Sequence, residues 1–253
     1  GVLVIPGQHL GDHELVALLR RFGDLAFTVG ETPVPGRPEL NVVTNVGRTT
    51  PPHSEFHVDT TYVRHPPAYT ALSAVEVPDR GGATLFTDQR LALDTLPCDL
   101  RARIDGRSMT HVVTGLELGD DAETAAEHPL VRPHPRSRQP ALYLTTPARC
   151  AAVSGLDPAE GKRLVAALLA HSTRPDRTLA HHWSTGDLVI WDNACVMHKA
   201  DHSDVAGHRT MHRGMVTHAG HWSGAARNSP PSTTLGPLST FGDGRRLPGQ
   251  AVK

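Results

Sequence analysis

The sequence predicts a mainly β fold with peripheral helices, built as a two-sheet barrel or jelly roll. Its 253 residues contain several short apolar or alternating segments, bounded by turn-forming residues, and few segments with helical periodicity. Long polar connections join these segments, as is typical of barrels and sandwiches. We find no internal repeat and no linker. We therefore expect one domain over residues 1–222 and a flexible tail over 223–253, which is rich in Gly, Pro, Ser and Thr.

The first half of the chain is expected to hold one longer helix among short strands. Apolar residues from Leu15 to Phe22 recur at helical spacing, which predicts an amphipathic helix over residues 10–25. Three prolines in residues 31–40 predict a loop. Strands are expected at residues 2–5, 41–46, 69–77 and 83–87, and short helices at 91–96 and 99–104.

The second half of the chain contains one helix with clear start signals and one segment whose secondary structure the sequence pattern does not predict. Residues 105–140 mix acidic residues with prolines, and so long a loop in a compact domain is usually a lid or binding loop. Asp157, Pro158 and Glu160 form a helix start, with Asp157 as the N-cap and the helix running to about His171. Strands are expected at residues 141–145, 188–191 and 209–217.

Composition excludes several classes of protein. A formal net charge of -1 gives no reason to expect nucleic acid or an anionic membrane as a partner. No apolar run approaches the ~20 residues that a membrane-spanning helix needs, and the first residues lack the basic region of a signal peptide. The three cysteines, Cys98, Cys150 and Cys195, form no CxxC pair, which argues against a disulfide framework and suits a cytoplasmic location. A homo-oligomer is left open.

The segment His57-Val58-Asp59 is the leading candidate for a metal site. On an extended backbone, residues i and i+2 point to the same side, so the imidazole and the carboxylate would project together. Two such ligands and one distant histidine make the three-point face that holds non-haem Fe(II). The triplet alone is weak evidence, because 17 His and 26 Asp+Glu produce chance matches, of which His53-Ser54-Glu55 and His202-Ser203-Asp204 are examples.

The third ligand is expected to be His198, which follows the apolar strand and polar turn of GDLVIWDNACVMHKA. Beyond it, Arg209 and Arg213 would share one strand face about 13 Å apart. Arginines that point into a barrel are costly unless each meets an anion. A dicarboxylic 2-oxo acid would supply one: its keto acid end can chelate the metal and its far carboxylate can pair with a guanidinium. The Thr84 hydroxyl could donate to the same carboxylate.

Several residues in and around these motifs have other possible roles. His53 and His57 could form a helical zinc pair, but Pro51-Pro52 disfavours a helix there. Trp191 is interpreted as core, and Asn45 and Tyr62 as candidate substrate contacts near the mouth of the barrel. The remaining histidines near the C-terminal strand are interpreted as surface or supporting residues: His202, His208, His212, His218 and His221.

Together these motifs resemble a known family, the Fe(II)/2-oxoglutarate-dependent dioxygenases of the taurine dioxygenase and 2,4-dichlorophenoxyacetate dioxygenase type. The resemblance covers most of residues 1–218. The resemblance rests on the following motifs and on the spacings between them: RRFGDL, His57-x-Asp59, Pro66-Pro67, GGATLFTD, GDLVIWDN, His198 and RTMHR.

The resemblance implies a fold, a cofactor set and residue roles. The fold would be a double-stranded β-helix, which is a cupin-like jelly roll. His57, Asp59 and His198 would bind iron, while Thr84 and Arg209 would hold the distal carboxylate of the cosubstrate 2-oxoglutarate. Arg213 would face either the cosubstrate or an anionic substrate. The implied reaction uses O2 and converts 2-oxoglutarate to succinate while a C–H bond is hydroxylated or otherwise oxidised.

Departures from the family pattern concern the substrate rather than the metal. Ala194 stands where relatives commonly carry Arg, His181-His182 replaces an Arg often found before Trp183, and LTTPARC lacks the Asn or Phe of relatives' substrate loops. Asp59 argues against halogenation, because halogenating relatives have a small residue there. We expect a small, carboxylate-bearing substrate, an amino acid or a natural-product intermediate.

Three alternatives remain open from the sequence. The first is a dioxygenase that scavenges sulfonates or phenoxyacids. The second is a metal-binding β-barrel that senses 2-oxoglutarate without catalysis. The third is a hydrolase that uses the same ligands for zinc, and it would not need Arg209 or Thr84.

Overall fold

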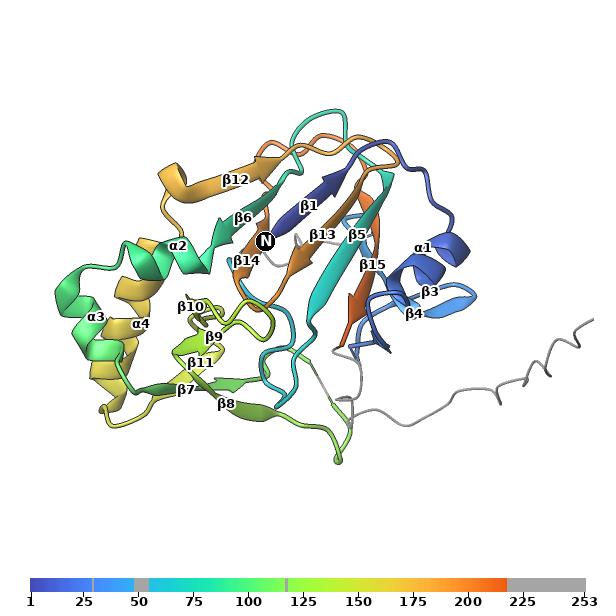
Figure 1. Ribbon diagram of the computed structural model, residues 1–253. Coiled ribbons are helices and arrows are strands. Elements are labelled where there is room, and N and C mark those ends of the chain that lie inside the picture. The colour runs from blue at the N-terminus through green and yellow to red at the C-terminus, as the bar shows by residue number, and fades with distance from the viewer. Residues whose placement is uncertain (29, 48–54, 117, 218–253) are drawn as a thin grey trace, which may run out of the picture.

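The computed structural model describes residues 1–28, 30–47, 55–116 and 118–217. The fold is mainly β with few helices, as predicted (Figure 1). The largest sheet has the strand order β1-β13-β5-β15-β4-β3, and β2 pairs with β15. Its strands are β1 (Val2–Ile5), β2 (Leu25–Ala26), β3 (Pro33–Val34), β4 (Arg37–Thr44), β5 (Tyr69–Glu76), β13 (Leu188–Asp192) and β15 (Thr210–Val216).

A second sheet has the order β12-β6-β14 and is antiparallel throughout. Its strands are β12 (Thr178–His181), β6 (Thr84–Asp88) and β14 (Val196–Ala200). One apolar cluster is shared between the two sheets: Leu72 of β5, Val189 and Trp191 of β13, Phe86 of β6 and Val196 of β14. The two sheets thus enclose a common core, which is the arrangement of a jelly roll.

Helix α1 (Asp12–Leu19) covers the other face of the large sheet. Its apolar stripe, Leu15, Val16 and Leu19, packs on residues of that sheet such as Leu188 and is fully buried. The helix is shorter than the predicted 10–25, and Phe22 lies beyond it, 44% exposed. The amides of Arg21 and Phe22 bond to carbonyls three residues back, which tightens and ends the helix.

The remaining elements form a third layer at one end of the molecule. They are α2 (Gln89–Asp94), α3 (Cys98–Ile104), α4 (Pro158–Ser172), the short 3₁₀ helix Pro175–Arg177, and the strands β7 (Ser108–Val112), β8 (Ala125–Pro129), β9 (Val131–Pro133), β10 (Pro140–Leu142) and β11 (Cys150–Val153). Leu164 and Leu168 of α4 pack on Met109 and Leu130 in a second large cluster. Asp157 caps α4 as predicted, because its side chain accepts from the amides of Ala159 and Glu160.

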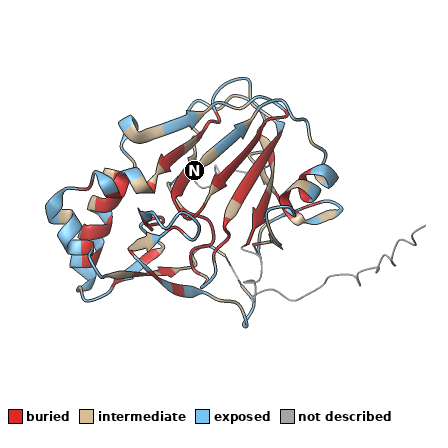
Figure 2. Cartoon of the chain, in the orientation of Figure 1, coloured by how far each residue is buried: buried red, intermediate tan, exposed pale blue. Residues whose placement is uncertain are grey.

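Two expected loops contain regular structure. The segment 31–40 holds the β3–β4 hairpin, in which Pro35 and Gly36 form the turn and Gly36 adopts φ +74. The segment 105–140 is not one long loop, since it contains β7, β8 and β9. Burial alternates along β7 and β8 (Figure 2), but three of the four buried positions are His or Ala, so the alternation is weak in hydropathy. The role of this segment as a lid stays a prediction.

Several predictions lie outside the described residues. They are the flexible tail at 223–253, the pairing of His53 with His57, and the surface roles of His218 and His221. Among the helices in the described ranges, none is long and apolar enough to cross a membrane.

Candidate active site

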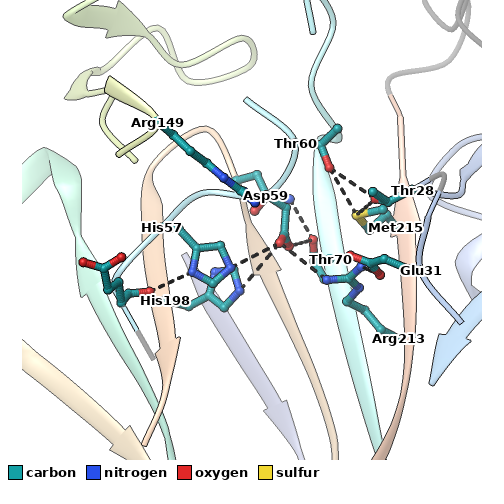
Figure 3. Close-up of polar contacts among 12 residues, drawn as sticks. Thr28, Glu31, His57, Asp59, Thr60, Thr70, Arg149, His198, Arg213 and Met215 are labelled. Atoms are coloured by element: carbon teal, nitrogen blue, oxygen red, sulfur yellow. Dashed lines mark hydrogen bonds and ion pairs between the residues drawn. The ribbon is translucent and has the colours of Figure 1, made fainter. Parts of the chain in front are cut away.

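A pair of backbone hydrogen bonds brings the two predicted histidine ligands together. His57 donates its amide to the carbonyl of His198, and His198 donates to the carbonyl of His57, each at 2.9 Å. His198 follows β13 and its turn, as predicted, and it lies within β14, so the second sheet fixes its direction. The two imidazole centroids are 4.2 Å apart (Figure 3).

Asp59 completes a three-residue cluster with these histidines. Its Oδ1 lies 3.6 Å from Nε2 of His57 and 3.8 Å from Nε2 of His198. The ligand atoms of the three side chains all lie within 4.8 Å of one another. The other carboxylate oxygen, Oδ2, accepts a hydrogen bond from the Thr70 hydroxyl at 2.7 Å, and Thr70 accepts in turn from Asn193 at 2.9 Å. This chain of bonds turns Oδ1 towards the imidazoles.

The donor set suits a divalent first-row metal. Nδ1 of His57 lies 2.9 Å from the Glu55 carbonyl, which can only accept, so Nδ1 carries the proton and Nε2 keeps its lone pair. Burial acts to raise the pKa of Asp59, but His198, His57 and Arg213 outweigh it and hold the pKa well below its usual value. An ionised carboxylate and two imidazoles on one face match the Fe(II) site of oxygenases.

Arg209 lies deep in the barrel without an acidic partner among the described residues. It is 3% exposed, and burial lowers the pKa of its guanidinium to about 10. Nε donates to the Gly82 carbonyl at 3.0 Å, and Nη2 donates to the Thr84 hydroxyl at 3.2 Å. A buried guanidinium is costly unless an anion compensates it, so this position calls for one.

Thr84 is oriented to help hold such an anion. It is 1% exposed, and its oxygen accepts from both Arg209 and the indole Nε1 of Trp183, the latter at 3.0 Å. With both lone pairs engaged, the hydroxyl proton remains as a donor. Thr84 and Arg209 are thus in contact, and their shared role in holding a carboxylate stays a prediction.

Asn45 supports Arg209 rather than opening into the site. Its Oδ1 accepts from the Arg209 amide at 2.8 Å, and its Nδ2 donates to the Gly207 carbonyl at 3.1 Å. The amide side chain is thus engaged at both ends and fixes the start of β15. Its predicted contact with substrate stays a prediction.

Arg213 lies on the opposite side of Asp59 from the imidazoles (Figure 3). Its Nη1 is 3.7 Å from Asp59 Oδ1, and its Nη2 forms an ion pair with Glu31. The negative charge that we expected beside Arg213 is therefore provided in part by the carboxylates of Glu31 and Asp59.

Tyr62 is buried among these charges, 4% exposed. Burial raises the pKa of its phenol, with Glu31 and Asp59 adding to the rise and Arg149 and Arg213 opposing it. Arg149 reaches the same region (Figure 3), where its Nε donates to the Thr114 hydroxyl at 3.1 Å. Tyr62 therefore lies among the charged groups of the site, and its contact with substrate stays a prediction.

Four residues of the site carried no usable signal in the sequence. Thr70 sits in an alternating strand, and its hydroxyl resembles that of any strand threonine. Asn193 lies within GDLVIWDN, but only its contact with Thr70 gives it a role. Glu31 and Arg149 lie in segments that read as loops, and their partners are distant in sequence.

His134, Asp192 and Cys195 form a second cluster of candidate metal ligands. Their hydrogen bonds indicate a structural role and not a metal site. Nδ1 of His134 accepts from the amides of Arg136 and Ser137, so Nε2 carries the proton and donates to Asp192 at 2.8 Å. Burial raises the pKa of Cys195 to about 11, which keeps the thiol protonated. Neither nitrogen of the imidazole is left for a metal.

A jelly roll with a His-Asp-His face and a buried arginine beyond it defines the class of metal- and keto-acid-dependent oxygenases. Comparison with known proteins gives the family. Residues 1–215 match the model of the "Taurine catabolism dioxygenase TauD, TfdA family". The chain belongs to this family, and it is a 2-oxoglutarate-dependent non-haem iron dioxygenase.

Three relatives illustrate the range of the family. The chain is 34% identical to the alpha-ketoglutarate-dependent 2,4-dichlorophenoxyacetate dioxygenase of Cupriavidus pinatubonensis, over 84% of this chain and 83% of the relative. It is 30% identical to pentalenolactone F synthase of Streptomyces arenae, over 83% and 80%. The crystal structure of a taurine dioxygenase from Burkholderia xenovorans superimposes with a TM-score of 0.73 at 30% identity, over 86% and 76%. The cupin-like double-stranded β-helix is thereby confirmed.

Proposed function

We propose that this enzyme oxidises an unactivated C–H bond of a small molecule, either an amino acid or a natural-product intermediate. In this proposal His57, Asp59 and His198 hold Fe(II), and Arg209 and Thr84 hold the distal carboxylate of 2-oxoglutarate. The three metal ligands occupy one face and leave the opposite face for cosubstrate, O2 and substrate. When bound, the iron and 2-oxoglutarate together supply the O2-derived oxidant, and 2-oxoglutarate ends as succinate.

The observation that carries the proposal is Arg209. A guanidinium that is 3% exposed, with no carboxylate partner among the described residues, is costly to bury, and a bound anion would offset that cost. The keto acid fits, because its carboxylate can receive donors from Arg209 and from the free proton of Thr84. A zinc hydrolase would need neither residue.

The protein's own residues contribute position and a dry environment. Thr70 and Asn193 orient Asp59, and the backbone pair between His57 and His198 fixes the angle between the imidazoles. Arg213 lies beside Asp59, and Tyr62 is buried close to both charges; in this proposal these two residues define where substrate is held. We expect hydroxylation as the default outcome.

The substrate class rests on two considerations. Pentalenolactone F synthase, a natural-product enzyme by name, is a relative at 30% identity, which is consistent with a tailoring role. A phenoxyacid or sulfonate scavenger is the alternative, given the named dioxygenases among the relatives. We favour the former, because Glu31 already engages the arginine that would receive such an anion.

The test is succinate formation with Fe(II), ascorbate and 2-oxoglutarate, measured with and without a panel of candidate substrates. Wild type should release succinate, and candidate substrates should raise the rate. His57→Ala and Asp59→Ala should abolish turnover, whereas His13→Ala, on the exposed face of α1, should retain it. Full activity in either ligand variant would refute the metal assignment.

A further inference from the structure

The ion pair between Glu31 and Arg213 joins two distant segments inside the site. Glu31 lies in the connection from β2 to β3, and Arg213 lies in the middle of β15. The side chain of Arg213 is 12% exposed, and that of Glu31 is 29% exposed. Figure 3 shows both next to Asp59, on the side away from the two imidazoles.

This pair changes the charge that a substrate meets. Arg213 also lies 3.7 Å from Asp59, but that carboxylate is directed at the metal position. Without Glu31, the guanidinium would be the nearest buried cation on this side of the site and would attract an anionic group. With Glu31 in place, a substrate carboxylate near Arg213 would also approach a carboxylate of the protein.

Glu31 can also accept from a ligand. Its Oε2 is the atom bonded to Arg213. Across the described part of the chain, Oε1 makes no hydrogen bond or ion pair. Because the Glu31 side chain is 29% exposed, its carboxylate can accept a hydrogen bond from a protonated amine of a ligand.

We propose that Glu31 determines specificity: it closes Arg213 to substrates whose only charge is an anion and favours substrates that carry a protonated amine. This inference rests on the proposed function, because it assigns the substrate class of the same site. It separates this enzyme from a phenoxyacid scavenger by the charge that the substrate must carry, since repulsion of the wrong ligand contributes to specificity as much as attraction of the right one.

The experiment measures binding by calorimetry, with the full chain loaded with Mn(II) and N-oxalylglycine, an unreactive analogue of 2-oxoglutarate. The first probe is 2,4-dichlorophenoxyacetate, a purely anionic ligand. Glu31→Gln should bind it at least about tenfold more tightly than wild type, because the amide keeps a hydrogen bond to Arg213 and removes the repelling charge. Glu39→Gln, a surface residue paired with Arg20, should change nothing.

A double variant assigns the gain to Arg213. In Glu31→Gln with Arg213→Met, the added affinity for 2,4-dichlorophenoxyacetate should disappear, because the cation that received the anion is gone. Glu31→Ala should reproduce the gain if Glu31→Gln folds poorly, as judged by its melting temperature. No gain in either single variant overturns the proposal.

A second pair of probes tests the amine. Phenylalanine and 3-phenylpropanoate differ only by the amino group, so wild type should bind phenylalanine more tightly, and Glu31→Gln should lose or reverse this order. The same order of affinity in both proteins overturns the amine preference. Failure of N-oxalylglycine to bind in wild type would instead refute the proposed function, and this first titration keeps the two failures apart.

Discussion

At the scale of single residues, the site depends on polar side chains that burial forces into definite states. Asp59 is held ionised by its neighbours, His57 is held in one tautomer by a carbonyl, and Arg209 is held charged at the cost of desolvation. The charges of Asp59 and Arg209 are costly to bury unless a counter-charge compensates them, and a bound metal and a bound anion would add to that compensation. These residues are therefore in the charge states and the tautomer that binding of a metal and an anion requires.

Replacing Arg209 should weaken cosubstrate binding selectively. Arg209→Ala removes a charge-assisted pair worth about 2–5 kcal/mol, so the apparent affinity for 2-oxoglutarate should fall at least about 30-fold. Metal affinity should change little, because Arg209 touches none of the three ligands in the described structure. The measurement is succinate formation against 2-oxoglutarate concentration, beside a metal titration. The surface variant Arg174→Ala is the control, and an unchanged 2-oxoglutarate requirement would exclude the role.

His111 should make the protein less stable in mild acid. It is fully buried against His128 and Tyr143, and burial lowers its pKa to about 3. The unfolded chain, with a pKa near 6.5, binds the proton first, so this contribution to stability is intact above pH 6.5 and is lost as pH falls towards 3.

The expected loss between pH 7 and 5.5 is about 1 kcal/mol of unfolding free energy. In His111→Phe this part of the pH dependence should vanish, whereas the exposed His13→Phe should keep it. Urea unfolding at the two pH values measures the difference. An identical pH slope in wild type and His111→Phe would contradict the assignment.

At the scale of elements, turns and strand pairings place the site residues. The turn Gly81-Gly82 leads into β6, and the carbonyl of Gly82 accepts from Arg209. Gly82 has φ +73, and an added Cβ would lie 3.2 Å from Arg209 Cδ and 2.9 Å from Pro78 Cγ. This turn is thus part of the wall against which the guanidinium is packed.

Gly82→Ala should impair cosubstrate binding as well as stability. The positive φ alone costs about 1–2 kcal/mol, and the contact with Arg209 should displace its guanidinium, lowering affinity for 2-oxoglutarate about tenfold. Gly36→Ala is the matched control, since Gly36 has φ +74 and nothing within 4 Å of an added Cβ. Both variants should lose stability, but only Gly82→Ala should bind 2-oxoglutarate more weakly. If both variants bind 2-oxoglutarate equally well, the contact between the added Cβ and Arg209 does not displace the guanidinium, and the prediction is contradicted.

Much of the element order could be predicted from sequence, and the exceptions have physical causes. The β13 and β15 strands and the Asp157 cap were signalled by apolar runs and capping chemistry, which act locally. The β7 and β8 strands were missed because two buried histidines and one buried alanine hide the alternation. Glu31 could not be paired with Arg213 in advance, because that contact depends on how distant segments meet.

At the scale of the whole molecule, the metal position joins parts of the chain that are far apart. His57 and Asp59 precede β5 of the large sheet, whereas His198 lies in β14 of the second sheet. Because the clustered ligands exist only in the folded chain, metal binding should add directly to folding stability.

Metal removal should therefore lower the melting temperature. At a metal concentration 100 times the dissociation constant, the gain is about 2.7 kcal/mol. Chelation of the wild type should reverse it, and Asp59→Asn should neither gain from metal nor lose from the chelator. Thermal unfolding with Mn(II) or EDTA measures the effect. A wild type that melts at one temperature in both conditions would argue against metal at this position.

The reciprocal backbone bonds between His57 and His198 also bear on synthesis. As the chain leaves the ribosome, His57 and Asp59 emerge long before His198, and they have no β14 to pair with until most of the protein has been made. A nascent chain that has not yet exposed His198 can offer at most two of the three ligands. Loading with iron at all three ligands is accordingly expected only after His198 has emerged, and chains that terminate before residue 198 would lack the third ligand.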